Sequence, residues 1–144
     1  MAMVEKKMVV RASMQRMFEI IRDYERYPEF LPELASVEVL SRDGNVAVAR
    51  FEIEMMMRVV YTLRLLVTEP DGVTWTLEEA RLLATNAGQW NLKAIDETTT
   101  EVTYGVDLAF RGMIPESVSD RLQAIVLLQT LERFKARAEA SEPS

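Results

Sequence analysis

The sequence predicts an α+β domain in which an antiparallel β-sheet is covered by one long C-terminal helix. Apolar and polar residues alternate with a period of two between Leu34 and Arg111, and turn sequences recur roughly every 10 to 14 residues, which is typical of an antiparallel meander. Residues 116–139 contain no Gly or Pro and can form a helix long enough to cross such a sheet. A chain of 144 residues is long enough for one domain with a sizeable core.

The N-terminal segment is expected to form a strand and two short helices. Residues 3–11 read as the strand, and Ser13 is a suitable N-cap for a helix that runs to about Asp23. Residues 24–32, YERYPEFLP, contain two prolines and three aromatic side chains. We expect the second helix here, with Pro28 in its first turn and the second proline at its end.

Six further strands are expected to form the rest of the sheet. Their ranges are 34–41, 46–56, 58–69, 73–80, 88–94 and about 100–110. Residues 43–45 (DGN) and 70–72 (PDG) are turn sequences between successive strands. Every second residue of each strand is apolar, so one face of the sheet needs a cover.

The C-terminal helix is expected to supply that cover. Pro115 suits its start. Four residues lie within about 60° of one another on a helical wheel and are expected to face the sheet: Val118, Leu122, Ile125 and Gln129. The opposite side carries three further apolar residues: Leu127, Leu131 and Phe134. The middle of the helix is therefore apolar nearly all round, as expected when a curved sheet grips a helix that also touches a second element or subunit.

The composition excludes several classes of chemistry. With no Cys and no His, the chain cannot form a disulfide, a Cys/His zinc site or a nucleophile–histidine pair. The net charge of −6 disfavours binding to phosphate backbones, so no direct nucleic-acid partner is expected. The acidic residues lack metal-binding spacing and no Gly-rich nucleotide-binding motif is present, so we expect neither metal nor cofactor. Without a long apolar stretch or a signal-peptide pattern, we expect a cytoplasmic protein.

Three segments resemble a known family: DYERYPEFLP at 23–32, Gly88 and Trp90 in AGQWNL, and RFKARAE at 133–139. Over roughly residues 3–139 the chain resembles the polyketide cyclase/dehydrase and coenzyme Q-binding group of the START-like (SRPBCC) superfamily. The resemblance implies the helix-grip (START/Bet v 1-like) fold, in which a seven-stranded antiparallel sheet wraps around a long C-terminal helix and two short helices follow the first strand. It also implies an apolar cavity between sheet and helix. Residues 3–139 are then a single domain, and 140–144 a frayed tail.

The candidate ligand-binding residues come from the apolar face of the sheet and the expected inward stripe of the helix. They are Phe51, Ile53, Met55, Tyr61, Leu63, Trp75, Leu77, Trp90, Tyr104, Val106, Leu122, Ile125 and Gln129. Packing as an ordinary core is the alternative, but buried Tyr and Trp need polar partners, and ligand pockets combine apolar walls with a few such groups. Ala47, Ala49 and Gly88 are expected to leave room. Gln129 either anchors a ligand oxygen or bonds a neighbouring side chain.

Three surface features each have a structural and a functional interpretation. The aromatic segment 24–31 is either a gate over the cavity entrance or a hydrophobic plug. Residues 81–83 (RLL) are expected to form a turn with two exposed leucines near that entrance. Met56, Val60 and Leu66 are expected on the outer face of the sheet, where they favour a homodimer or a transient membrane contact, although scattered exposed apolar residues are normal.

Two functions of different class follow for a domain of this kind. The first is a carrier or chaperone that binds a hydrophobic small molecule, such as a quinone, a lipid or a polyketide-like compound. The second is a polyketide aromatase/cyclase, for which Glu79, expected on the inner face, and the weak acids Tyr61 and Tyr104 are thin support. No catalytic residue is assigned, and a non-catalytic binder is favoured. A ribosome-association toxin, the third function found on this fold, is disfavoured by the net negative charge.

Overall fold

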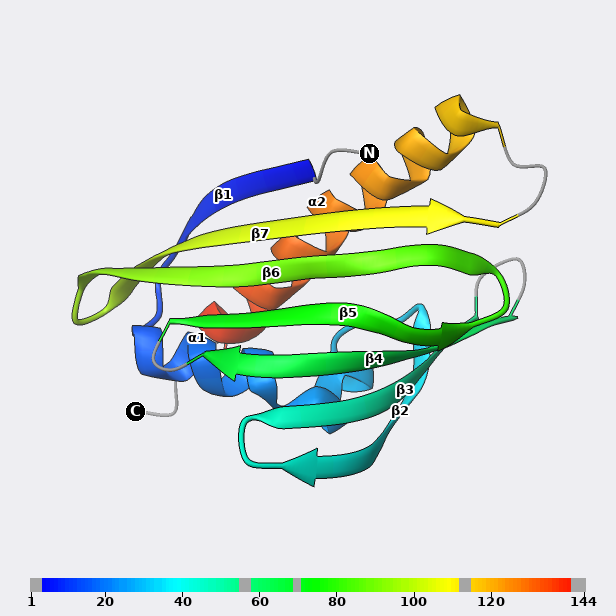
Figure 1. The fold of residues 1–144 in the computed structure, drawn as a ribbon. Coiled ribbons are helices and arrows are strands. Elements are labelled where there is room, and N and C mark those ends of the chain that lie inside the picture. The colour runs from blue at the N-terminus through cyan, green and yellow to red at the C-terminus, as the bar shows by residue number, and fades with distance from the viewer. Residues whose placement is uncertain (1–3, 55–57, 69–70, 112–114, 141–144) are drawn as a thin grey trace.

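The computed structural model describes residues 4–54, 58–68, 71–111 and 115–140 (Figure 1). Its elements are β1 (Val4–Val10), α1 (Met14–Arg22), the 3₁₀ helix η1 (Tyr24–Glu29), β2 (Leu34–Asp43), β3 (Val46–Glu54), β4 (Arg58–Thr68), β5 (Gly72–Ala80), β6 (Leu83–Asp96), β7 (Thr99–Phe110) and α2 (Glu116–Ala140). The predicted order of strands and helices is confirmed. η1 begins at Tyr24, so Pro28 lies near its end and not in its first turn.

All seven strands pair antiparallel in one sheet of order β1-β7-β6-β5-β4-β3-β2. Strands β2 to β7 form the expected meander, and β1 adds to the free edge of β7. The sheet curves around α2, which crosses behind it (Figure 1). This arrangement confirms the helix-grip fold. Gly44, the first residue of the two-residue β2–β3 turn, has φ +61°, a conformation that glycine adopts without strain.

Irregularities in the strand register alter which side chains lie on the inner face of the sheet. The β4–β5 ladder shifts between Thr62 and Leu63, so that Glu79 pairs with Thr62, which is also the partner of exposed Arg50. Glu79 is therefore exposed on the outer face, and the expectation that it faces inward is wrong. A shift of one residue turns a side chain to the other face of a sheet. β2 carries two further shifts, between Leu34 and Ser36 and between Val39 and Ser41.

The helix α2 buries a different stripe from the one expected. Among its described side chains, the buried ones are Gln123, Leu127, Leu131, Phe134 and Ala138. Ile125 and Gln129 are exposed, and the side chains of Val118 and Leu122 lie outside the described residues. Ile125 and Gln129 line the cavity between the sheet and the helix, but the buried side of α2 is the other one. The middle of the helix is apolar nearly all round, so periodicity alone gives two apolar faces.

Gln123 is a buried polar residue with a structural role. Its side-chain oxygen accepts a hydrogen bond from the backbone N–H of Leu108, at 2.5 Å. Leu108 is a buried residue, and its backbone N–H needs an acceptor, which Gln123 supplies. Gln123 thus ties the start of α2 to the end of β7.

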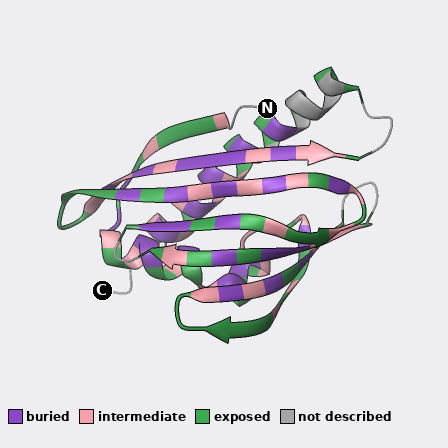
Figure 2. Ribbon diagram, viewed as in Figure 1, coloured by how far each residue is buried: buried purple, intermediate pink, exposed green. Residues whose placement is uncertain are grey.

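Burial alternates along the central strands, as Figure 2 shows for β3 to β7. On the outer face Leu66 is exposed and Val60 half-buried, while Met56 lies outside the described residues. The dimer or membrane-docking role of this surface stays a prediction. Among the helices described, none has both the length and the apolar composition that crossing a membrane requires.

Candidate functional site

A cavity of about 250 Å³ lies between the inner face of the sheet and α2. Most of the predicted residues line it: Phe51, Ile53, Tyr61, Leu63, Trp75, Trp90, Tyr104, Val106, Ile125 and Gln129. Leu77 is not among the described lining residues, although it pairs with Leu63. Met55 and the side chain of Leu122 lie outside the described residues. Alternation along strands β3 to β7 brings the strand residues of this set to one face of the sheet.

Aromatic rings form a continuous chain along the cavity wall. Trp75 stacks on Tyr104 with ring centroids 5.8 Å apart, and Tyr104 contacts Trp90 at 4.4 Å. Trp90 contacts Phe134 of α2 at 4.7 Å, and Phe134 meets Tyr27 of η1 edge to face at 5.1 Å. Sheet, C-terminal helix and η1 are thereby joined through one set of aromatic contacts, which hold the wall in a fixed shape.

Trp75 is positioned by two residues of β6. Its indole N–H donates a hydrogen bond to the side-chain oxygen of buried Asn86, at 3.0 Å. A Cβ atom at Gly88 would lie 2.3 Å from the Trp75 ring. The expectation that Gly88 leaves room for a ligand is therefore wrong, because the indole already fills that space. Asn86 was not predicted, yet extending the alternation of Gly88, Trp90 and Leu92 back by one step would have found it.

The polar groups of the inner wall are hydroxyls and amides. Tyr104 and Thr130 of α2 both line the cavity, and the Thr130 side chain partly offsets the effect of burial on the Tyr104 pKa. Burial raises the pKa of Tyr104, Tyr61 and Tyr27 well above the ordinary tyrosine value. These phenols therefore stay protonated at neutral pH and can donate or accept hydrogen bonds without carrying charge. The Tyr27 hydroxyl donates to the Ile21 carbonyl and is already engaged.

Charged lining residues lie at the mouth of the cavity. Glu33, which follows η1, and Arg133 of α2 both line it, with Nη2 and Oε2 3.9 Å apart. Exposed Ile125 and Gln129 line the same cavity from α2. A mouth that combines charge with apolar surface can admit an apolar body and leave a polar end in water.

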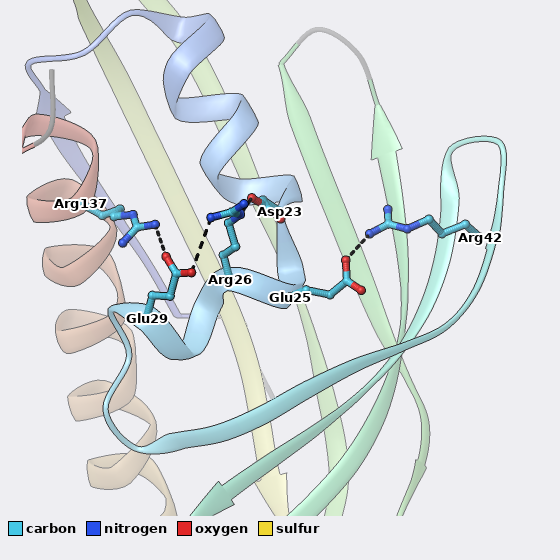
Figure 3. A network of polar contacts seen from close by, with 6 residues as sticks. All are labelled: Asp23, Glu25, Arg26, Glu29, Arg42 and Arg137. Carbon is cyan, nitrogen blue, oxygen red and sulfur yellow. Dashed lines mark hydrogen bonds and ion pairs between the residues drawn. The ribbon is translucent and has the colours of Figure 1, made fainter. Parts of the chain in front are cut away.

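The segment that follows α1 covers part of the cavity. Tyr27 and Leu31 line it, and Phe30 packs edge to face on Phe134 at 4.9 Å. Figure 3 shows η1 held to α2 by Glu29, which bonds Arg137 at 2.5 Å. These contacts favour the hydrophobic plug over the gate as the role of this segment.

Leu83 also belongs to the wall and not to an exposed lip. Because β6 begins at Leu83, this side chain is buried and lines the cavity, and Leu82 is half-buried. The expectation of two exposed leucines is wrong, since the strand starts five residues earlier than the alternation from Gly88 indicated.

Of the described lining residues, only Glu33 and Arg133 carry charge at neutral pH. The acidic side chains in the described ranges form no cluster that could hold a metal ion.

Known structures share this fold. An aromatase/cyclase from Streptomyces sp. R1128, named Zhui, is 19% identical, with 96% of this chain and 93% of that chain covered and a TM-score of 0.83. A START superfamily protein from Mycobacterium smegmatis is 18% identical, with coverage of 95% and 97% and a TM-score of 0.86. The di-domain ARO/CYC StfQ of the steffimycin biosynthetic pathway is 14% identical, with coverage of 95% and 50% and a TM-score of 0.79.

Sequence comparison assigns the family. No curated protein sequence matches the chain. Residues 10–135, most of the chain, match the profile of the family described as polyketide cyclase / dehydrase and lipid transport. The resemblance seen in the sequence is confirmed, and the chain belongs to the polyketide cyclase / dehydrase and lipid transport family.

Proposed function

We propose that this protein binds a hydrophobic small molecule, such as a quinone, a lipid or a polyketide-like compound, in the cavity between the sheet and α2, and acts as its carrier or chaperone. The observation that carries the proposal is the apolar, aromatic wall, whose charged described members stand at the mouth. Burial of apolar ligand surface is worth about 25 cal/mol per Å². A wall of this kind can bind an apolar ligand without catalysing a reaction.

The size and polarity of the cavity narrow the ligand. At about 250 Å³ the cavity is slightly smaller than the pockets that enclose drug-sized molecules, which span about 300 to 1,000 Å³. A ring system or chain end fits inside, and a longer tail would extend through the mouth between Glu33 and Gln129. Tyr104, Thr130 and Gln129 offer hydrogen-bonding groups for a ligand carbonyl or hydroxyl.

A second candidate function is an aromatase/cyclase. It is favoured by the family description and by Tyr104, whose neutral hydroxyl lies in the wall beside Thr130 and could supply a proton. The described inner wall holds no carboxylate or amine that could act as a base. Turnover of a poly-β-ketone that falls in Tyr104→Phe, while binding of the substrate is retained, would establish the enzyme in place of the carrier.

The first experiment is extraction of the protein, purified under mild conditions from its own host, into organic solvent, followed by mass spectrometry. A stoichiometric quinone or lipid is the expected result. Both tryptophans of the chain line the cavity, so their fluorescence reports occupancy directly. Titration with a short-chain quinone should quench it saturably.

Two exposed residues of α2 make a matched pair of variants. Ile125 lines the cavity, whereas Leu128 does not, and their exposed fractions are 44% and 41%. Ile125→Asp should weaken quinone binding about tenfold or more, because a carboxylate beside an apolar ligand loses hydration, whereas Leu128→Asp should leave it unchanged. Equal effects of the two variants, or an empty protein that quenches with neither quinone nor fatty acid, would refute the carrier.

A further inference from the structure

Asn86 of β6 is a buried amide side chain in the wall of the ligand cavity. It lines the cavity from the inner face of the sheet, and the residue is 8% exposed. Within the described residues, the pairing of β5 with β6 ends at Trp75 and Gly88, so Asn86 is the first inward-facing residue of β6 beyond that ladder. The two strands are joined there through side chains, because the Trp75 indole reaches across to Asn86.

The contact with Trp75 fixes the orientation of the Asn86 amide. An indole N–H can only donate, so the atom that receives it, at 3.0 Å, is the side-chain oxygen Oδ1. The nitrogen Nδ2 then lies on the other branch of the amide, where it donates to no group of the described chain. A molecule that approaches this branch meets N–H donors.

The Asn86 nitrogen is open to the cavity. The described polar side-chain atoms that are sealed in the protein without a partner belong to Tyr24 and Asp107, and the Asn86 nitrogen is not one of them. It therefore keeps accessible surface, and the residue lines the cavity, so its free N–H groups face the space that a ligand would fill. A buried donor without an acceptor costs folding free energy, and an oxygen brought by a ligand would remove that cost.

The other neutral polar groups of the described wall are less selective. A hydroxyl both donates and accepts, so Tyr61, Tyr104 and Thr130 suit a ligand donor as well as a ligand acceptor. Gln129 carries both a donor and an acceptor, and it is exposed. Asn86 presents donors to the cavity, because its oxygen is turned to Trp75.

We propose that Asn86, oriented by Trp75, determines ligand specificity by donating a hydrogen bond to an uncharged acceptor oxygen, such as a ketone, quinone or ester carbonyl. The inference rests on the proposed binding of a hydrophobic small molecule. A carboxylate is disfavoured beside Asn86, because burying it needs a cation, and the cation of the described wall, Arg133, stands at the mouth. Asn86 contacts the ligand, and Trp75 is a positioning residue.

Three ligands of matched shape test the proposal: 1-tetralone, tetralin and tetralin-1-carboxylate. Tetralone and tetralin differ only in that a carbonyl replaces a methylene group. Water solvates the ketone better than the hydrocarbon, so the readout is the change in the ratio of their two affinities between the parent protein and a variant. Two-dimensional ¹H–¹⁵N NMR titration measures each affinity and also observes the Asn86 side-chain amide.

Asn86→Leu is the main variant. It should weaken binding of 1-tetralone about tenfold, which corresponds to about 1.4 kcal/mol, and should leave binding of tetralin as tight or tighter. Asn91→Leu is the matched control, because Asn91 is an amide of the same strand that is exposed and does not line the cavity. Its ratio of affinities should equal that of the parent.

Two further readouts separate a hydrogen bond from a general change of the cavity. In the parent protein, 1-tetralone should shift the Asn86 side-chain amide protons downfield and tetralin should not, a measurement that needs no variant to fold. Trp75→Phe should lower the ratio of affinities several-fold, because the amide loses the donor that orients it. An unchanged ratio in Trp75→Phe would overturn the positioning role of Trp75.

The outcomes distinguish this inference from the proposed function. Binding of both tetralone and tetralin with unmoved Asn86 amide signals, or an equal loss of tetralone binding in Asn86→Leu and Asn91→Leu, would overturn the inference and leave the proposed binding intact. Preferred binding of the carboxylate that is lost in Arg133→Gln would overturn it in favour of a charged anchor at the mouth. A parent protein that binds none of the three would overturn both.

Discussion

Tyr24 and Tyr27, one turn apart on η1, face two different cavities. Tyr27 lines the large apolar cavity, and its hydroxyl donates to the Ile21 carbonyl. Tyr24 lines a second, small cavity beside Arg22 and Arg42, and its hydroxyl has no partner. The rings contact each other edge to face at 5.9 Å. The difference shows that a short helix can place one tyrosine hydroxyl on a backbone acceptor and leave its neighbour's hydroxyl buried without a partner.

Alkaline pH should cause the largest loss of stability, through the tyrosines on both sides of η1. All four tyrosines of the chain have raised pKa values in the folded state. The contribution of these tyrosines to the free energy of unfolding is complete below about pH 10, the pKa of tyrosine in the unfolded chain. It is lost as the pH rises toward the higher pKa values of the folded state, at about 1.4 kcal/mol per pH unit for each tyrosine. Urea unfolding between pH 9 and 11.5 should show this decline.

Tyr24→Phe sharpens that measurement. The variant should reduce the slope of the decline by one tyrosine's share, because only three tyrosines remain. A rise in tyrosinate absorbance with a midpoint near 10, while the near-ultraviolet circular dichroism of the folded protein is unchanged, would contradict the burial of these groups.

The second-largest effect is expected from two glycine substitutions, one beside Trp75 of the large cavity and one in the turn beside the small cavity. Gly88→Ala should cost about 3 kcal/mol or more, because its Cβ would meet the Trp75 ring at 2.3 Å and the Gly105 carbonyl at 2.4 Å. Gly44→Ala, in the turn beside the small cavity, meets open space and should cost only about 1 kcal/mol for its positive φ. Urea denaturation measures both. A smaller loss at Gly88 than at Gly44 would mean that Trp75 does not hold the observed position.

The smallest expected change in stability distinguishes the hydroxyl groups of Tyr24 and Tyr27. Tyr27→Phe should destabilise the protein by about 1 kcal/mol, because the Ile21 carbonyl loses its donor. Tyr24→Phe should raise the stability instead, because it removes a buried hydroxyl that has no hydrogen-bond partner. Thermal melts of the two variants provide the measurement. A shift of the same sign in both would show that the two hydroxyls have equivalent surroundings.

The strands and most of the cavity wall could be predicted because alternation is a local property. Phe51, Tyr61, Trp90 and Tyr104 lie in regular ladders, where the period of two holds from one residue to the next. Glu79 was predicted on the wrong face, because the register shift at Thr62 depends on pairing between strands and cannot be read from either strand alone.

The helix and the small cavity could not be predicted for different reasons. α2 is apolar nearly all round, so the choice between the Ile125 side and the Leu131 side depends on the shape of the sheet that it meets. The small cavity brings Arg42 of β2 beside Arg22 and Tyr24, and no pattern in the sequence connects β2 with that earlier segment. Tertiary structure alone creates that juxtaposition.

The register shifts of β2 have a consequence for contacts between molecules. β2 and β1 are the edges of the sheet, and an edge offers unpaired backbone groups to any extended chain. The two shifts in β2 interrupt that row of groups, and β1 presents the exposed charges of Glu5, Lys6 and Lys7. Both edges therefore resist the addition of a foreign strand. Interrupted ladders and charged side chains are the devices by which natural sheets reduce edge-to-edge aggregation.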